Sequence, residues 1–287
     1  MLGEPPRDHI VRALTDDGSF RVVAAATKNT VTEAMRVQDV PPALRKQFAE
    51  FLTATILVRD TMAPDMRLQT ILQGDDNRSR LVADTQTGGG ARGLIQLAKG
   101  KTEMPIANGG ILKVSRPIHD GSLHQGIVGV PESGSIAGAF MRYMQESEQI
   151  VTMIAVGVHM HNDEVIAAGG YLVQILPEIQ KGPLMVMTER LRDFEDIVPL
   201  LREGKGTPKE LIEETFYGMP YTLVSEAPVQ FSCSCSEERV ALSLASLPKA
   251  EIESMIADGN MLELTCDYCR KDYTFHPERL RGALGTN

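Results

Sequence analysis

The residues of this chain that are best placed for chemistry are its four cysteines, which all lie near the C-terminal end. Cys233 and Cys235 form a Cys-x-Cys pair, Cys266 and Cys269 form a Cys-x-x-Cys pair, and 30 residues separate the two pairs. Two such pairs can supply the four ligands of a tetrahedral zinc site, with zinc–sulfur distances of about 2.3 Å. Four thiolates leave no coordination position open for a substrate water. The spacing therefore predicts one zinc ion per chain, in a structural or redox-responsive site.

The Cys-x-Cys half distinguishes this quartet from an ordinary zinc ribbon, which pairs two Cys-x-x-Cys knuckles. Thiolates that bind zinc remain nucleophilic and can be oxidised. A disulfide that closes over one intervening residue is strained, so it is readily reduced again. Zinc with four thiolates carries a net negative charge, which Arg239, Arg270 and Lys271 are close enough in sequence to offset. The spacing therefore favours a reversible switch.

Other motifs that could carry chemistry are better explained as structure. Gly88–Gly90, followed by Arg92, lacks the endings of both common phosphate-binding loops and is typical of a hairpin loop. His159 and His161 lie beside a turn with no third metal ligand in view, which favours strand-end histidines. His276 is not needed once four cysteines are present. Because no nucleophile elbow, zinc-protease or deaminase signature occurs, the sequence nominates no catalytic residues, and we expect a protein that is not an enzyme.

The chain that must position the cysteines changes character twice. The first part alternates helical and strand patterns with short turns and more strands than helices, which predicts an α+β fold rather than a doubly wound sheet. A helical pattern follows, and the cysteine-bearing tail begins near Val229. We therefore expect a strand-rich core domain over 1–178, a helical linker over 179–228 and a small zinc-binding domain over 229–287.

Within the core domain, the patterns predict a helix over 30–62 that is interrupted at Pro41 and Pro42, and a second helix in the later half of 134–149. Predicted strands bound by turn-forming residues cover 66–73, 80–84, 93–97, 111–115, 126–130, 150–158 and 165–176. In the tail, we expect a helix from Pro248 to Gly259, and strands over 261–264 and 273–275 that bracket the second cysteine pair.

An apolar stripe at helical spacing marks the linker. Pro199 is expected to end or bend this helix, and Thr207 with Glu210 has the form of a capping box around Pro208. The helix that carries the stripe and the helix that begins at Pro208 are both expected to be short, and short helices are marginal without tertiary support. The stripe must therefore be covered by the core, by the folded tail or by both. Its members are Leu184, Met187, Leu191, Phe194 and Ile197.

Composition limits the classes of function. The net charge of −9, from 29 basic and 38 acidic residues, repels nucleic-acid phosphates, and acidic residues outnumber basic ones from Phe231 onward. Both facts disfavour the alternative of a zinc ribbon that binds nucleic acid. A second alternative, a thiol-disulfide oxidoreductase that uses Cys266 and Cys269, would need this motif at a helix start beside a βαβ unit. The expected strand on each side of the motif argues against it.

The sequence also carries no membrane or export signal. The N-terminal residues lack the basic-then-apolar pattern of a signal peptide, and the most apolar stretch, 150–160, is 11 residues long and too short to span a bilayer. We therefore expect a soluble cytoplasmic protein with no membrane partner. Four cysteines clustered in such a chain indicate a metal site more than a disulfide scaffold.

Several segments resemble the heat-shock protein 33 family of redox-regulated holdase chaperones. The cysteine motifs, with Phe231 and Arg239 flanking the first pair, have the family's form. The turn over 74–78 departs from the family's usual Gly-Asp-Gly-Pro-like form, which affects only a loop. Further segments that look like the family, in the same order, are Leu68–Gly74, Leu81–Asp84, Ala91–Gly93, Tyr143–Gln149 and Ala168–Pro177.

This resemblance implies an ATP-independent chaperone that binds unfolding or misfolded client proteins under oxidative stress. It implies that the reduced protein is inactive and holds zinc through the four cysteines. Oxidation by peroxide or hypochlorite would release the metal and form disulfides between neighbours, Cys233–Cys235 and Cys266–Cys269. The tail and linker would then lose structure and expose apolar surface. We also expect a homodimer in the oxidised state.

Overall fold

The computed structural model describes residues 7–118, 121–177, 181–245 and 247–276, and these form two compact units. The first unit is Met1–Ser232 and the second unit is Cys233–Asn287. The predicted end of the core domain at residue 178 lies outside the described residues. The segments predicted as core and linker both belong to the first unit, and the cysteines belong to the second.

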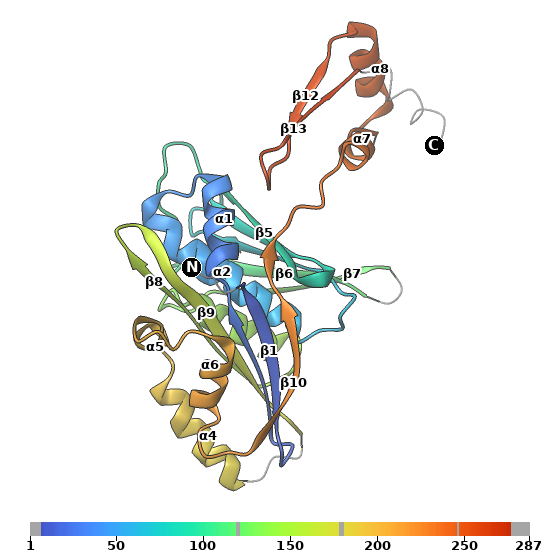
Figure 1. Ribbon diagram of the computed structural model, residues 1–287. Helices are drawn as coiled ribbons and strands as arrows, with labels where there is room; N and C mark the ends of the chain where they lie inside the picture. Colours follow the sequence, from blue (N-terminus) through green and yellow to red (C-terminus); the bar gives the residue numbers. More distant parts are fainter. Residues whose placement is uncertain (1–6, 119–120, 178–180, 246, 277–287) are drawn as a thin grey trace, which may run out of the picture. The chain divides into compact units, whose positions relative to one another are not determined.

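Two sheets organise the first unit (Figure 1). The first sheet is antiparallel and has the order β10-β1-β2-β9-β8, and the second has the order β11-β5-β4-β3-β6-β7. The strands of the first sheet are β1 (His9–Thr15), β2 (Phe20–Ala26), β8 (Thr152–His161), β9 (Glu164–Ile175) and β10 (Tyr221–Pro228). Those of the second are β3 (Leu68–Gln73), β4 (Arg80–Thr85), β5 (Gly90–Gln96), β6 (Ile111–Pro117), β7 (Leu123–Gly129) and β11 (Gln230–Phe231).

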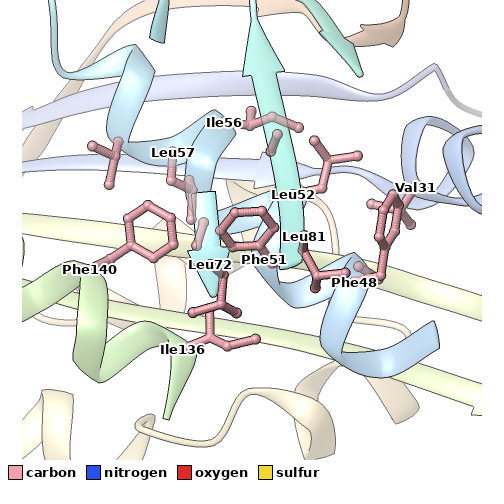
Figure 2. Packing of buried hydrophobic residues seen from close by; sticks show 14 of the residues in the cluster. Val31, Phe48, Phe51, Leu52, Ile56, Leu57, Leu72, Leu81, Ile136 and Phe140 are labelled. Carbon is pink, nitrogen blue, oxygen red and sulfur yellow. The ribbon is translucent and has the colours of Figure 1, made fainter. Parts of the chain in front are cut away.

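Helices α1 (Lys28–Gln38), α2 (Pro42–Asp60) and α3 (Ile136–Glu146) fill the space between the two sheets. Figure 2 shows Phe51 and Phe140 close together in this layer, with ring centroids 6.0 Å apart. Leu72 and Leu81 from the second sheet pack into the same cluster (Figure 2). Nearly all of α2 beyond its first turns is buried, because this helix has a sheet on each side.

The predicted interruption of the first helix is confirmed. Asp39 ends α1 in a left-handed conformation with φ of 47°, and Pro42 opens α2, where a missing N–H costs nothing. The third helix is longer than predicted, because Ser135 caps it by accepting a hydrogen bond from the Gly138 N–H at 2.9 Å. The predicted strands of the core are all present, with ends shifted by a few residues.

The inner strands of the first sheet are buried on both faces. Along β2, Val23 and Ala25 pack toward the central helices, whereas Phe20, Val22 and Ala24 pack in a separate cluster on the opposite face. This second cluster is covered by α4 (Lys181–Asp193), α5 (Val198–Arg202) and α6 (Pro208–Thr215). The alternation of side chains along a strand therefore serves two separate cores.

The first sheet therefore covers the apolar stripe of the linker. Met187 and Ile197 are 1% and 0% exposed, and Leu191 and Phe194 pack against the same cluster while half-buried. Pro199 lies in the first turn of α5 and does not end the preceding helix, which stops at Asp193. The capping box is confirmed, because Thr207 Oγ1 accepts from the Glu210 N–H and the Glu210 carboxylate accepts from the Thr207 N–H.

The last part of the predicted helical linker is a strand. β10 pairs with β1 along His9–Thr15, and the short β11 then pairs with β5 in parallel at Gly90 and Ala91. The strap, which we define as residues 221–232, therefore runs along both sheets. Its last residue, Ser232, donates its N–H to the Ala91 carbonyl at 3.0 Å and directly precedes Cys233.

Candidate metal centre

A hairpin positions the second cysteine pair. β12 (Leu262–Thr265) and β13 (Asp272–Phe275) are antiparallel, and both cysteines lie in the loop between them. The Cys266 N–H donates to the Lys271 carbonyl at 2.9 Å, and the Cys266 carbonyl accepts from the Arg270 N–H at 2.8 Å. Arg270 has a left-handed φ of 58°, which turns the chain back after Cys269. The predicted strands on each side of this pair are confirmed.

The first pair lies in an irregular segment that leads into α7 (Glu237–Ala245). Arg239, on the first turn of this helix, donates to the Ser234 carbonyl at 3.0 Å and so fixes the residue between Cys233 and Cys235. Cys235 lies two residues before the start of α7. Arg239 thus supports the first pair through the backbone.

The four cysteine sulfurs converge, all lying within 4.8 Å of one another. Sγ of Cys233 is 3.8 Å from Sγ of Cys266, and Sγ of Cys235 is 3.3 Å from Sγ of Cys269. A tetrahedral zinc–thiolate site with bonds of about 2.3 Å requires sulfurs about 3.8 Å apart. The donor set and its spacing therefore fit one zinc ion held by all four predicted residues.

The electrostatics of the cluster bear on whether it can hold a cation. Burial and, to a smaller extent, hydrogen bonds with the three neighbouring cysteines together raise the pKa of the Cys269 thiol to about 12. Four thiolates at these distances repel one another, so only a bound cation makes the charged form of the cluster favourable. A bound divalent ion would supply that compensation.

Tyr273 is a member of the site that sequence reasoning missed. Its hydroxyl donates to Cys235 Sγ at 3.0 Å, and this contact raises the pKa of Tyr273 above its usual value. Such hydrogen bonds to ligating sulfur stabilise the charge and orient the ligand. Lys271 lies over the same ring, with its Nζ 5.3 Å from the centroid. The strand predicted over 273–275 is confirmed, but no sequence signal links Tyr273 to a cysteine 38 residues earlier.

The described part of the second unit has little apolar core. Among its described residues, Ile252, Tyr273 and Phe275 are the buried hydrophobic side chains, whereas Leu242 and Met261 are exposed. A unit of this size with so small a core needs a metal or disulfides to fold. α8 (Lys249–Asp258) contributes Ile252 and ends at Gly259 in a left-handed conformation, as predicted.

The other motifs take the structural roles predicted for them. Gly88 and Gly89 belong to the loop of the β4–β5 hairpin, and Arg92 pairs with the fully buried Asp84. His159 and His161 lie at the end of β8. Within the described part of the chain, the cysteines are the one group of three or more His, Cys, Asp or Glu side chains arranged to hold a metal. None of the described helices combines the length and apolar character needed to cross a membrane.

Comparison with known proteins agrees along nearly the whole chain. The family described as Hsp33 protein matches residues 8–276. The 33 kDa chaperonins of Syntrophotalea carbinolica and Bacillus pumilus are each 32% identical to this chain. The first alignment covers 97% of this chain and 99% of the relative, and the second covers 95% and 97%.

A solved structure shows the same fold. The 33 kDa chaperonin of Thermotoga maritima superimposes with a TM-score of 0.81 at 23% sequence identity, covering 97% of this chain and 98% of that one. The α+β fold expected from the sequence is thereby confirmed. The described residues keep the family's four-cysteine cluster at Cys233, Cys235, Cys266 and Cys269. With a family match over residues 8–276 and full-length relatives above 30% identity, the chain belongs to the Hsp33 family of chaperones, which are not enzymes.

Proposed function

We propose that this chain is an ATP-independent holdase whose four cysteines form a zinc-dependent redox switch. The observation that carries the proposal is a four-thiolate cluster inside a unit with little other core. Bound zinc supplies folding free energy, about 10 kcal/mol or more for structural sites. The reduced chain is therefore folded throughout and inactive, and the order of the second unit depends on its thiolates.

Oxidation removes the ligand set. Two neighbouring thiolates give up two electrons and form one disulfide, while one hydrogen peroxide takes up the electrons and two protons and leaves as two waters. Hypochlorite can act as the same two-electron oxidant, with chloride as the product. The disulfides Cys233–Cys235 and Cys266–Cys269 consume all four thiolates, so the second unit loses the ligands on which its folding depends.

The linker then loses structure as well, because α4 packs incompletely against the first sheet. Between α4 and the first sheet lies a cavity of about 410 Å³, lined by Phe20, Val173, Leu184 and Met187 among others. Elements with such loose packing open at low cost in free energy. The strap joins this linker directly to Cys233, so disorder in the second unit starts next to β11. Undocking exposes the apolar stripe, which then binds unfolding client proteins.

The proposed setting is the cytoplasm, with unfolded or misfolded proteins as partners and neither nucleic acid nor membrane involved. The oxidised, active form is proposed to be a homodimer. The negative net charge is compatible with clients that are recognised by apolar rather than phosphate contacts.

The function is tested by measuring zinc content and client aggregation on the same samples. Reduced protein is expected to carry one zinc per chain and to leave a thermally unfolding client to aggregate. Peroxide should release the zinc, and the treated protein should suppress aggregation without ATP. The double variant Cys266→Ser/Cys269→Ser should lack zinc and be active without peroxide. Reduced protein without zinc, or oxidised protein that protects no client, would refute the proposal.

The disulfide pairing is a separate prediction. In the folded cluster, sulfurs of different pairs are in contact, Cys233 with Cys266 at 3.8 Å and Cys235 with Cys269 at 3.3 Å. Once the unit unfolds, however, chain proximity sets the effective concentration, and only one and two residues intervene within the two pairs. Peptide mapping after mild oxidation should therefore find Cys233–Cys235 and Cys266–Cys269. A majority of cross-pair disulfides would instead mean that oxidation occurs within the folded cluster.

A further inference from the structure

The first unit contains a second distinctive site, on the side of the first sheet where α5 ends. A cavity of about 390 Å³ lies between the core and the loop that joins α5 to α6. Such a volume is in the range of small-molecule sites. The core side is formed by the start of β1, the start of α1 and parts of β8 and β9, and the linker side by Leu201, Arg202, Gly204, Gly206 and Thr207.

The cavity is basic although the chain as a whole carries a net charge of −9. Arg7, Lys28 and Arg202 are permanent cations on its walls, and His9 and His159 add charge when protonated. The one acidic side chain in the lining is Asp8.

Asp8 already accepts hydrogen bonds from Asn29 and Thr30. Its carboxylate, 4% exposed, accepts from the Thr30 N–H at 2.6 Å, from the Thr30 hydroxyl at 2.7 Å and from the Asn29 N–H at 3.1 Å. These hydrogen bonds hold the carboxylate at the start of α1. It therefore cannot also serve as a close partner for the cations across the cavity.

Three basic side chains that line the cavity lack a partner among the described residues. Among the described residues, Lys28, His159 and Arg202 make no side-chain hydrogen bond or ion pair. They come from α1, from β8 and from the last residue of α5. Like charges gathered in one concave site raise its positive potential and attract an anion. Phosphate suits this set, because guanidinium and ammonium groups are its usual protein ligands.

The cavity also has an apolar part. Ala26, Ile166, Ala167 and Leu201 line it alongside the charged groups. A bare inorganic anion would use only the basic wall, whereas a phosphorylated organic molecule would use both. We propose that this cavity binds a small phosphorylated organic molecule, a nucleoside monophosphate being a fitting example, and that the bound ligand holds the linker docked.

The coupling to docking follows from the position of the walls. Lys28 and His159 belong to the core, whereas Arg202 belongs to the linker, so a phosphate bound between them would attract both sides of the cavity at once. A ligand that binds only the docked state stabilises it in proportion to ligand concentration. At ten times the dissociation constant, the population of undocked linker should fall about tenfold. The effect of the ligand on linker docking rests on the proposed function, whereas the binding of the ligand to the cavity does not.

Binding is tested with adenosine monophosphate and inorganic phosphate by titration calorimetry on the reduced, zinc-loaded chain. Adenosine monophosphate should bind saturably and at least tenfold more tightly than phosphate. The double variant Lys28→Gln/Arg202→Gln should lose at least tenfold in affinity, and Lys99→Gln, which removes an exposed lysine outside the cavity, should lose none. An absence of saturable binding, or equal affinity in the double variant, would overturn the assignment of the site.

Coupling is tested by hydrogen exchange and by activation rate. The nucleotide should increase protection of the α5 and α6 amides in the reduced chain, and should slow the onset of holdase activity after peroxide about tenfold in the wild type but not in the double variant. Unchanged protection despite binding would overturn the bridging role. If peroxide gives no activity even without nucleotide, the proposed function fails, while the calorimetric and exchange results still decide the site.

Discussion

Met187→Asp is expected to give a chaperone that is active while fully reduced, whereas Met185→Asp is expected to leave the switch intact. The two methionines lie on the same helix, α4, yet Met187 is 1% exposed and Met185 is 72% exposed. Met187 packs against the first sheet in the cluster that contains Phe20 and Val173. The two variants therefore place the same aspartate at a buried position and at an exposed position of one helix.

The expected size of the effect follows from burial. Removing a buried methionine side chain costs about 2–5 kcal/mol, and an unpaired carboxylate at the same place adds a further desolvation cost. Every 1.4 kcal/mol is about a tenfold change in an equilibrium, so docking of α4 should weaken by two orders of magnitude or more. The same charge at position 185 stays in water and costs little.

Three measurements check this prediction. Reduced Met187→Asp should suppress client aggregation without peroxide, should retain one zinc per chain and should lose amide protection over α4. Retained zinc separates undocking of the linker from general unfolding. Equal activity and equal protection in the two variants would show that α4 is not the element that covers the client-binding surface.

Gly89→Ala is expected to release the strap, and Gly88→Ala is expected not to. Both glycines have left-handed backbone conformations, with φ of 81° and 74°. A Cβ at Gly89 would lie 1.8 Å from the Pro228 carbonyl oxygen, whereas a Cβ at Gly88 meets nothing within 4 Å. Each substitution costs about 1–2 kcal/mol of backbone strain, but only the first also forces two backbone segments apart.

Hydrogen exchange on the reduced proteins distinguishes the two variants. Gly89→Ala should lose protection over β10 and β11 and should hold clients without oxidation, because the strap is the path from the second unit to the linker. Gly88→Ala should keep the wild-type pattern at slightly lower overall stability. If both variants behave alike, strain in the loop, and not contact with Pro228, explains the result.

The features that the sequence predicts best are the local ones. The break between α1 and α2 follows from adjacent prolines at 41 and 42, the start of α6 from a capping box, and the end of α8 from Gly259. The convergence of the four cysteines was predictable for another reason. A thiolate set at metal-binding spacing has few alternative uses in a reduced chain.

The elements that the sequence did not reveal depend on distant partners. β1 has buried residues on both faces, since a helical layer covers each side of its sheet, so it lacks a simple alternating pattern. β10 lies in a segment that was expected to be helical, and it forms a strand by pairing with β1, more than 200 residues earlier. The contact of Tyr273 with Cys235 is non-local in the same way. The sequence also could not show whether the core or the cysteine-bearing tail covers the apolar stripe of the linker.

The position of β10 at the border of its sheet has one more consequence. β1 pairs with β10 along His9–Thr15 on one side and with β2 along His9–Leu14 on the other. Departure of β10 would leave a new open edge, a row of backbone N–H and carbonyl groups without partners. Such an edge accepts any extended peptide by strand addition, with little regard to its side chains. Activation would then offer clients an open strand edge for backbone hydrogen bonds as well as an apolar surface. This combination suits a chaperone that must bind many unrelated sequences.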